Sequence, residues 1–236
     1  MFDASKRDGV LALERERTRW LSTGWDGGLV DANRAFNVTV PEGWNPDDLS
    51  AYVDGRLADA GFSRTSDDPV LLTGVAQRHA RGARCGPVEA VATVGVSNPA
   101  ALPMEPTGGT LPEEPEVVAG TVNVFVGTTR ALDDAALANL IAVAAEAKTA
   151  TLLDTVGFPG TTTDAVVAAC DPTGDSAAFS GSATRVGAAA RACVRDAVRA
   201  SYTSRYGDDE PPDSVADARH GVQTDVRGDV FVPDDG

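Results

Sequence analysis

A long apolar helix with two charged residues near its middle constrains this sequence more than any other segment. Residues 139–154 read "NLIAVAAEAKTATLLD" and belong to a helix expected at about 133–153, and Asp133 and Asp134 stand near its start, where the helix dipole favours negative charge. The side chains around the two charged residues, Glu146 and Lys148, are apolar on both sides of the helix. A helix of this kind needs a partner layer that buries it, and a sheet is the natural partner.

Segments with strand character surround this helix and supply that sheet. They are rich in β-branched residues or alternate in polarity, and they cover residues 9–22, 29–40, 69–75, 87–98, 121–129 and 161–170. Two further helices are expected at 45–62 and 182–206. Strands come first and then alternate with helices, so we predict an α+β fold. It is a single layered domain with a mixed β-sheet packed against two long helices, with an α/β sandwich as the alternative.

The length of 236 residues suits one domain with a good core. We assign residues 1–206 to that domain. Within it, residues 99–120 are rich in Pro, Gly and Glu, which predicts an exposed connection. Residues 207–236 are acidic and contain Pro, so we expect a mostly disordered tail.

The charge of the chain points to a protein that works in concentrated salt. The formal net charge is −15, the pI is about 4.4, and Lys6 and Lys148 are the only lysines. Molar salt screens the self-repulsion of such a surface. An ordinary acidic protein of dilute cytosol is the alternative. The same charge argues against nucleic-acid binding, because no basic patch is available to replace counterions on phosphates.

Cysteine and histidine are too sparse for a disulfide framework or a metal site. Cys85, Cys170 and Cys193 lie far apart, and only His79 and His220 could supply imidazole ligands. We expect no metal and no cofactor, and we place His79 on a surface loop. The amino terminus has no apolar leader and no stretch reaches the length of a membrane span, so we expect a soluble protein in the reducing cytoplasm.

The two charged residues of the long helix cannot pair with each other. At 100° per residue, Lys148 lies about 200° from Glu146, whereas Asn139 shares a face with Glu146. A charge among apolar side chains is costly unless it meets a partner or a ligand. Lys148 could instead extend to the helix edge. We expect one of the pair in a pocket, and we favour Glu146.

Several strand or helix ends carry polar residues that could act on a carbonyl. The segment "PGTTTDAV" presents Thr162 and Asp164 before an apolar strand, although a plain turn explains it equally well. Other candidates for substrate contacts are Ser22, Asn98, Asn123, Asn139 and Thr184. The chain has no GxSxG, Walker A, Rossmann or HExxH pattern.

Taken in order, six segments resemble those of the CbiZ family, the adenosylcobinamide amidohydrolases of corrinoid salvage. They are "LSTGWDGG", "AVATVGVSN", "GTVNVFVGTT", "EAKTA", "TTTDAVVAAC" and "SGSATRVG", and the resemblance runs from about residue 19 to 205. The family commonly has TGTGTD where this chain has "PGTTTD" at 159–164, with Asp164 kept. The acidic tail is not part of the family pattern.

The resemblance implies hydrolysis of the amide between the corrin ring and the aminopropanol arm of adenosylcobinamide, which gives adenosylcobyric acid. The cobalt then belongs to the substrate. From the chemistry of amide hydrolysis we predict that Glu146 activates water or orients the substrate, and that Lys148 or Asp164 handles protons. Thr162 and Asn98 would bind the amide oxygen. We expect Glu146→Gln to abolish turnover.

Three rival readings stay open at this point. The chain could be a non-catalytic corrinoid-binding protein, another amidase with a Thr or Ser nucleophile, or an interaction protein built on the acidic tail. The expected partner is a small corrinoid, with no nucleic acid and no membrane insertion. A homo-oligomer is left open.

Overall fold

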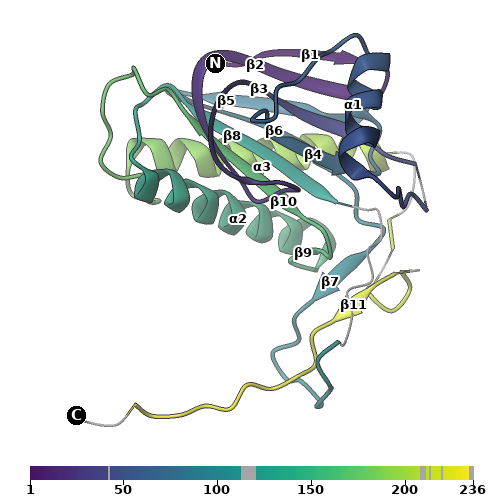
Figure 1. Cartoon of the computed structure of the whole chain (residues 1–236). Coiled ribbons are helices and arrows are strands. Elements are labelled where there is room, and N and C mark those ends of the chain that lie inside the picture. The colour runs from purple at the N-terminus through teal and green to yellow at the C-terminus, as the bar shows by residue number, and fades with distance from the viewer. Residues whose placement is uncertain (42, 113–120, 208–210, 213, 219, 234–236) are drawn as a thin grey trace.

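A curled mixed sheet forms the centre of the molecule, and two long helices cover one of its faces (Figure 1). The computed structural model describes all residues except 42, 113–120, 208–210, 213, 219 and 234–236. The strands of the main sheet are β1 (Asp3–Arg7), β2 (Val10–Ser22), β3 (Gly28–Thr39), β4 (Val70–Thr73), β5 (Arg81–Cys85), β6 (Val88–Val94), β8 (Val122–Thr128) and β10 (Ala165–Cys170). The helices are α1 (Leu49–Asp59), α2 (Asp134–Val156) and α3 (Arg185–Tyr206), with a 3₁₀ turn, η1, at Gln77–His79.

The main sheet contains both parallel and antiparallel pairs. Its order is β4-β3-β2-β10-β8-β6-β5, and β1 pairs with β2 beside that path. Strands β3 and β4 run parallel, as do β8 and β10, and the remaining neighbours run antiparallel. Helix α2 is the crossover that parallel β8 and β10 require. The predicted α+β domain with a mixed sheet and two long helices is therefore confirmed.

The main core lies between the sheet and the α2–α3 layer. Leu137, Leu140 and Ala144 of α2 are fully buried there, together with Ala190 and Val194 of α3. Strand β8 is buried along its whole length, because helices cover one face and the curled sheet covers the other. This explains why β8 is an almost continuous apolar run and not an alternating one.

Helix α2 is long and apolar enough to span a membrane by length and composition alone. The expectation that no segment reaches that length is therefore wrong for α2. Half of its apolar window is nevertheless buried inside the domain. We interpret α2 as the core helix of a globular protein.

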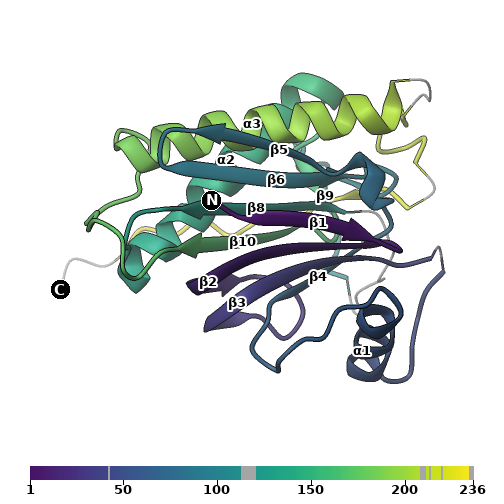
Figure 2. The same ribbon diagram turned by 90° about the horizontal axis from the view of Figure 1, so that it is seen from above.

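The other face of the sheet is covered by the sheet itself. Strand β2 changes register between Glu14 and Thr18, and Arg17 takes a φ of 53° there. The two halves of β2 then have different neighbours, since the first half pairs with β1 and the second half with β10. The amino-terminal strands consequently fold over the centre of the sheet (Figure 2). Trp20 and Phe125 are buried beneath them.

Two strands and one histidine differ from the sequence-based expectations. Strands β1, "DASKR", and β5, "RGARC", lie at sheet edges with mostly exposed side chains, so they carry no apolar pattern. The surface position expected for His79 is wrong. Its ring is buried, and its Nδ1 lies 3.1 Å from Ser204 Oγ of α3. Burial, followed by the nearby Arg78 charge, lowers the pKa of His79.

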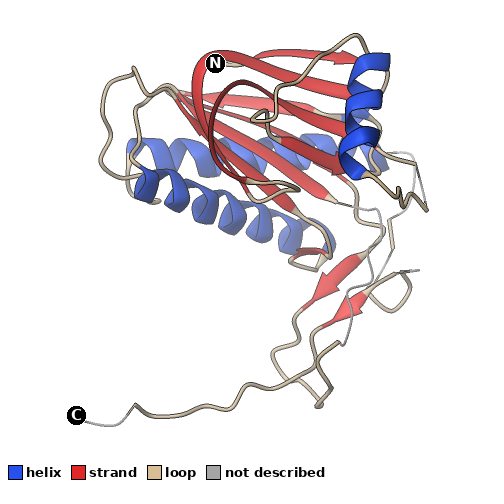
Figure 3. Cartoon of the chain, viewed as in Figure 1, coloured by secondary structure: helices blue, strands red, loops and turns tan. Residues whose placement is uncertain are grey.

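Three short strands form a second small sheet beside the main one (Figure 3). They are β7 (Pro99–Ala101), β9 (Gly160–Thr161) and β11 (Val222–Gln223), and β7 lies in the middle. Part of the expected connection at 99–120 is thus a strand, while residues 113–120 lie outside the described residues. Within the expected tail, β11 pairs in parallel with β7. The domain boundary at 206/207 stays a prediction.

Helix α1 begins later than its sequence suggests. It starts at Leu49, and the carboxylate of Asp48 accepts a hydrogen bond from the backbone N–H of Ala51 at 3.0 Å. Asn45 and Pro46 therefore precede the helix and do not begin it. The aspartate cap satisfies a free amide of the first turn, which decides the starting point.

Shortening a side chain of α2 should destabilise the domain only where that side chain lies on the inner face of the helix. Leu140 is fully buried, so Leu140→Ala leaves a cavity and should lower the free energy of unfolding by about 2–5 kcal/mol. Leu153, on the same helix, is 49% exposed, and Leu153→Ala should change it by about 0.5 kcal/mol or less. Denaturant titration in molar KCl measures both. Equal losses would contradict the core position of α2.

Candidate active site

The polar residues of interest gather where several strand ends meet. Thr23, just after β2, donates its backbone N–H to Val166 O of β10 at 3.0 Å. Thr121, just before β8, donates its hydroxyl to Thr73 Oγ1 of β4 at 2.9 Å. Gly95, just after β6, bonds Thr121 O at 3.0 Å. The carboxyl ends of β2, β4 and β6 therefore meet the amino ends of β8 and β10.

A buried ion pair between Lys148 and Asp164 lies at this edge. Lys148 Nζ donates to Asp164 Oδ2, and the two side chains are only 9% and 12% exposed. The carboxylate also accepts from the backbone N–H of Val122 at 2.9 Å, from the N–H of Thr161 at 3.1 Å, and from the Thr161 hydroxyl. Each oxygen of Asp164 thus accepts two hydrogen bonds, which compensates for the burial of its charge.

The sequence between α2 and β10 is shaped to allow this pair. Gly157, with a φ of 81°, ends α2 in the left-handed conformation, and the chain then turns back toward the helix. A Cβ atom on Gly160 would lie 2.6 Å from Asp164 Oδ2 and 3.0 Å from Lys148 Nζ. Glycine is therefore needed at position 160 because the backbone passes directly over the ion pair.

A second contact fixes the same loop to the segment between β6 and β7. Asn98 Nδ2 donates to Thr162 Oγ1 at 2.6 Å, and the backbone N–H of Thr162 donates to Asn98 O at 3.2 Å. Asn98 and Thr162, the two residues predicted to bind the amide oxygen, are therefore in direct contact. Their role in binding a substrate amide stays a prediction.

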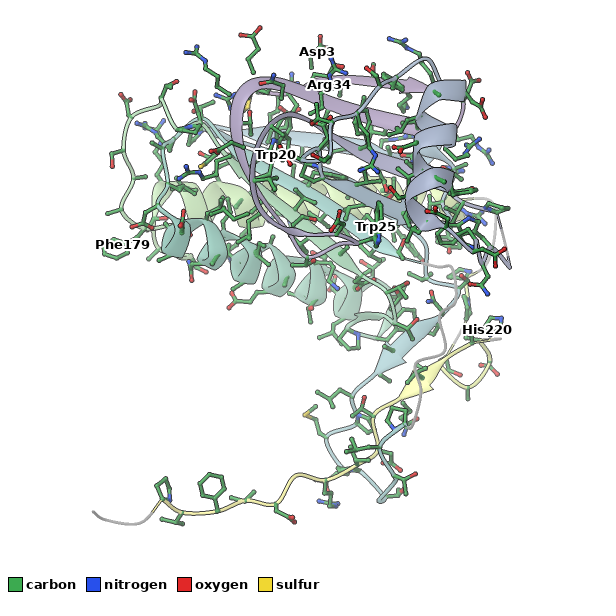
Figure 4. All side chains as sticks on the ribbon, viewed as in Figure 1. Asp3, Trp20, Trp25, Arg34, Phe179 and His220 are labelled. Carbon is green, nitrogen blue, oxygen red and sulfur yellow. The ribbon has the colours of Figure 1, made fainter. Side chains whose placement is uncertain are left out.

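A cleft of about 340 Å³ opens beside the ion pair. Asp164 and Thr163 form part of its wall, together with the hydroxyl residues Thr23, Thr73 and Thr121. The rest of the lining is largely apolar and aromatic and comes from Gly24, Trp25, Val40, Trp44, Leu71, Leu72, Gly74 and Ala165. Trp25, one of these lining residues, is labelled in Figure 4 and lies near α1. A charged residue in such a cleft is a candidate for chemistry.

A buried amide network lies next to this cleft. Asn123 Nδ2 donates to Asn37 Oδ1 and to Leu72 O, both at 2.9 Å, and Asn37 Nδ2 donates to Thr93 Oγ1 at 2.9 Å. These bonds join β3, β4, β6 and β8 across the curled sheet. Asn123 is 1% exposed, so it holds the strands together beneath the cleft and is not part of its lining.

The structure does not place Glu146 in a pocket. Its side chain is 62% exposed and pairs with Arg191 NH1 of α3 at 3.2 Å. The inward placement preferred for Glu146 over Lys148 is therefore wrong. The inner face of α2 is set by Leu140, Ala144 and Ala147, and Lys148 belongs to that face. Glu146 and Asn139 share the other face of α2, and both are exposed to solvent.

Two other predicted substrate contacts lie at the opposite end of the helices. Asn139 is exposed, and its Nδ2 donates to Ser180 Oγ at 3.0 Å. Thr184 caps α3 by accepting from the backbone N–H of Gly187 at 3.0 Å. Asn139 precedes Lys148 by nine residues, which is about 13 Å along a helix axis. The structure therefore does not bring Asn139 and Thr184 together with Asp164.

Ser22 lies near the cleft but not in its lining. It is buried at the end of β2, and its Oγ accepts from the backbone N–H of Gly24 at 3.1 Å. That bond shapes the loop that carries Trp25. Ser22 thus supports the site through the backbone.

The residues of the cleft that sequence reasoning did not select include Thr163, Trp25 and Trp44. No periodicity tells which of three consecutive threonines faces a cleft, because that depends on the turn between β9 and β10. The two tryptophans offered a better signal. Each lies in a polar or Gly-containing loop, "TGWDGG" and "EGWNPDD", outside any apolar pattern of the sequence.

The residues described offer no group of three or more His, Cys, Asp or Glu side chains that could hold a metal ion. The expectation of no protein-bound metal stays a prediction. Cys170 and Cys193 are buried, and burial raises the pKa of the Cys193 thiol to about 11. A thiol that stays protonated is a poor nucleophile.

Comparison with known proteins gives one consistent family. A family model described as adenosylcobinamide amidohydrolase, CbiZ, matches residues 2–210. A curated protein of that name from Halobacterium salinarum is 64% identical over 233 residues, covering 99% of this chain and 100% of that protein. A second, from Methanosarcina mazei, is 31% identical over 157 residues, covering 66% and 71%. A crystal structure of the PH0078 protein from Pyrococcus horikoshii aligns with a TM-score of 0.44 at 13% identity, over 84% of this chain and 78% of that one.

Loss of the buried lysine should be costly, whereas loss of the exposed glutamate should not. Lys148→Met leaves a buried carboxylate without its cation and should lower the free energy of unfolding by about 3–5 kcal/mol. Glu146→Gln removes an exposed pair and should cost about 0–1 kcal/mol. Denaturant titration of both variants in the same salt tests the assignment. A larger effect from Glu146→Gln would refute it.

Proposed function

This chain belongs to the CbiZ family of adenosylcobinamide amidohydrolases, and we propose that it hydrolyses the amide joining aminopropanol to the corrin ring of adenosylcobinamide. The products are adenosylcobyric acid and free aminopropanol. The substrate carries its own cobalt, and we propose no further cofactor. A non-catalytic corrinoid-binding role is not favoured, because the relative that aligns with 99% of this chain carries the name of an enzyme.

The observation that carries the proposed site is the position of Asp164. It is the charged group in the wall of the cleft, it is held by the buried Lys148, and it is surrounded by threonine hydroxyls. Hydrolysis of an unactivated amide needs a group that takes a proton from water and donors that stabilise the oxyanion. We propose that Asp164 takes the proton from water and that the threonine hydroxyls of the cleft stabilise the oxyanion. Thr163 is the nearest of these threonines to Asp164 along the chain.

Asp164 can accept a proton from water only if it releases one of its four donors. The Thr161 hydroxyl is the donor that can leave without backbone movement, because an O–H rotates about its C–O bond. A water molecule that takes its place would lie against the carboxylate. The remaining bonds, from Lys148 and from two backbone N–H groups, keep the carboxylate fixed.

The proposed reaction then runs in two steps. The water oxygen bonds to the amide carbon while its proton passes to Asp164, and the carbonyl oxygen becomes an oxyanion. The oxyanion collapses, the C–N bond breaks, and the proton moves from Asp164 to the departing amine nitrogen. The nearby positive charge of Lys148 favours the oxyanion and is unchanged at the end.

The hydrogen bond between Thr161 and Asp164 also permits a covalent route. In that route the Thr161 oxygen attacks the amide carbon while Asp164 takes its proton; the C–N bond then breaks, aminopropanol leaves with that proton, and water hydrolyses the acyl-enzyme ester to release adenosylcobyric acid and restore the Thr161 hydroxyl. Thr161 is 8% exposed, so it would have to turn toward the cleft first. Mass spectrometry of the protein during turnover separates the routes, because only the covalent one adds a corrinoid acyl group.

The surroundings in which the enzyme works follow from its charge and its cysteines. We propose a salt-adapted enzyme of the cytoplasm, as the composition and the relative from Halobacterium salinarum suggest. All three cysteines are unpaired, which suits a reducing compartment. The corrinoid is the proposed partner, and binding of nucleic acid is not expected at a net charge of −15.

Replacing Asp164 should remove turnover, whereas replacing Glu146 should not. Asp164→Asn keeps the shape but not the base, so kcat should fall about 10²–10⁴-fold. Glu146→Gln should retain kcat within about twofold, since its side chain is 62% exposed in a pair with Arg191. The assay is incubation with adenosylcobinamide in molar KCl, with adenosylcobyric acid and aminopropanol measured by chromatography and mass spectrometry.

The Asp164→Asn variant tests the assigned base, and the wild-type protein tests the reaction. Turnover in Asp164→Asn at the wild-type rate would contradict the assigned base while leaving the reaction intact. No product from the folded wild-type protein would contradict the reaction itself. Circular dichroism in the assay salt verifies that each variant is folded.

A further inference from the structure

Two of the three tryptophans line the cleft that contains Asp164. Trp25 comes from the loop between β2 and β3, and Trp44 comes from the loop between β3 and α1. The third, Trp20, is fully buried in the core under the curled sheet. The mechanism proposed above gives Trp25 and Trp44 no chemical task. Their position beside a reactive carboxylate therefore needs a separate explanation.

Each of the two indoles is supported by a neighbouring side chain. The guanidinium of Arg64 lies 5.6 Å from the Trp25 ring centroid, and Arg64 is held in turn by Asp54 at 2.6 Å. The Trp44 ring packs against Tyr52 of α1, with 5.0 Å between centroids. Such packing restricts both rings before a ligand arrives, which lowers the entropy lost on binding.

The size of the cleft limits what part of a corrinoid it can enclose. About 340 Å³ is near the lower end of ligand pockets, which span about 300–1,000 Å³. A corrin ring with its peripheral amides is much larger than one such pocket. The cleft can enclose the aminopropanol arm and its amide, while the ring must lie across the opening.

We propose that Trp25 and Trp44 form a platform that binds the edge of the corrin ring, so that the amide arm points down to Asp164. This inference rests on the proposed function. The apolar part of the lining, with Val40, Leu71 and Leu72, suits the methyl-bearing ring edge, and the hydroxyl part beside Asp164 suits the amide. Contact with the corrin ring determines affinity, and the Asp164 carboxylate determines turnover.

A platform of this kind also suits binding in concentrated salt. Molar salt screens ion pairs at the surface, so a site that held its substrate by charge would lose affinity there. Contact between indole rings and an apolar ring edge does not depend on charge. The platform therefore predicts corrinoid affinity that persists as KCl rises to molar concentrations.

The test measures binding of the corrin ring and of the aminopropanol arm separately. Cobyric acid, which carries the ring without aminopropanol, should bind the wild-type protein, and 1-amino-2-propanol alone should not. Trp44→Ala and Trp25→Ala should each weaken cobyric acid binding about tenfold and raise KM for adenosylcobinamide by a similar factor, with kcat within about twofold. Ultrafiltration in molar KCl, with corrinoid absorbance as the readout, gives the Kd values. Phe179→Ala, at a ring that is 76% exposed and lies outside the cleft, is the control.

A second pair of variants distinguishes the loss of the aromatic ring from a loss of folding. Trp44→Phe keeps an aromatic ring and should retain most of the affinity, whereas Trp44→Leu fills similar space without the ring and should not. Wild-type Kd values for cobyric acid in both tryptophan-to-alanine variants and in Trp44→Leu would overturn the platform. Tryptophan-dependent binding of cobyric acid by a protein that does not hydrolyse adenosylcobinamide would instead support the platform and refute the proposed reaction.

Discussion

The ion pair between Lys148 and Asp164 is the interaction on which the rest of the site depends. Burying two opposite charges is unfavourable unless every lone pair and N–H finds a partner, and here the carboxylate receives four donors from three segments. Those segments are α2, the loop that follows it, and the start of β8. The pair therefore fixes the distance between a helix and a strand end, and the threonines of residues 161–163 take their positions from it. Gly160 is the backbone requirement that this arrangement imposes.

The curled sheet explains why chemistry collects at one edge. Because β2 changes partner at its bulge, β3 and β4 are carried over the centre of the sheet and meet β8. The amide network of Asn37 and Asn123 makes that meeting stable, since each buried amide hydrogen bond replaces a contact with water. A flat sheet of the same strand order would leave Thr73 far from Thr121. The cleft is thus a product of topology more than of any single motif.

Much of the fold could be predicted from the sequence, because the core helices and central strands have strong apolar patterns. The edge strands β1 and β5 could not, since exposed, charged strands lack such patterns. For the site, the sequence selected Asn98, Thr162, Lys148 and Asp164 as candidates but chose Glu146 as the residue that enters a pocket. Helical spacing shows which residues share a face, yet it does not show which face meets the sheet. The rarity of lysine was the better guide, because a protein that otherwise uses arginine had kept this amine in a buried position.

The connection from β8 through α2 to β10 has one further consequence. The two charged members of the site are only 16 residues apart, and a single crossover unit holds them. The opposite wall of the cleft, with Trp25 and Trp44, belongs to loops of the amino-terminal strands. Reactivity and recognition are therefore encoded in separate stretches of the gene. Changes confined to the loops that carry Trp25 and Trp44 can alter which molecule is held while the reacting groups stay as they are.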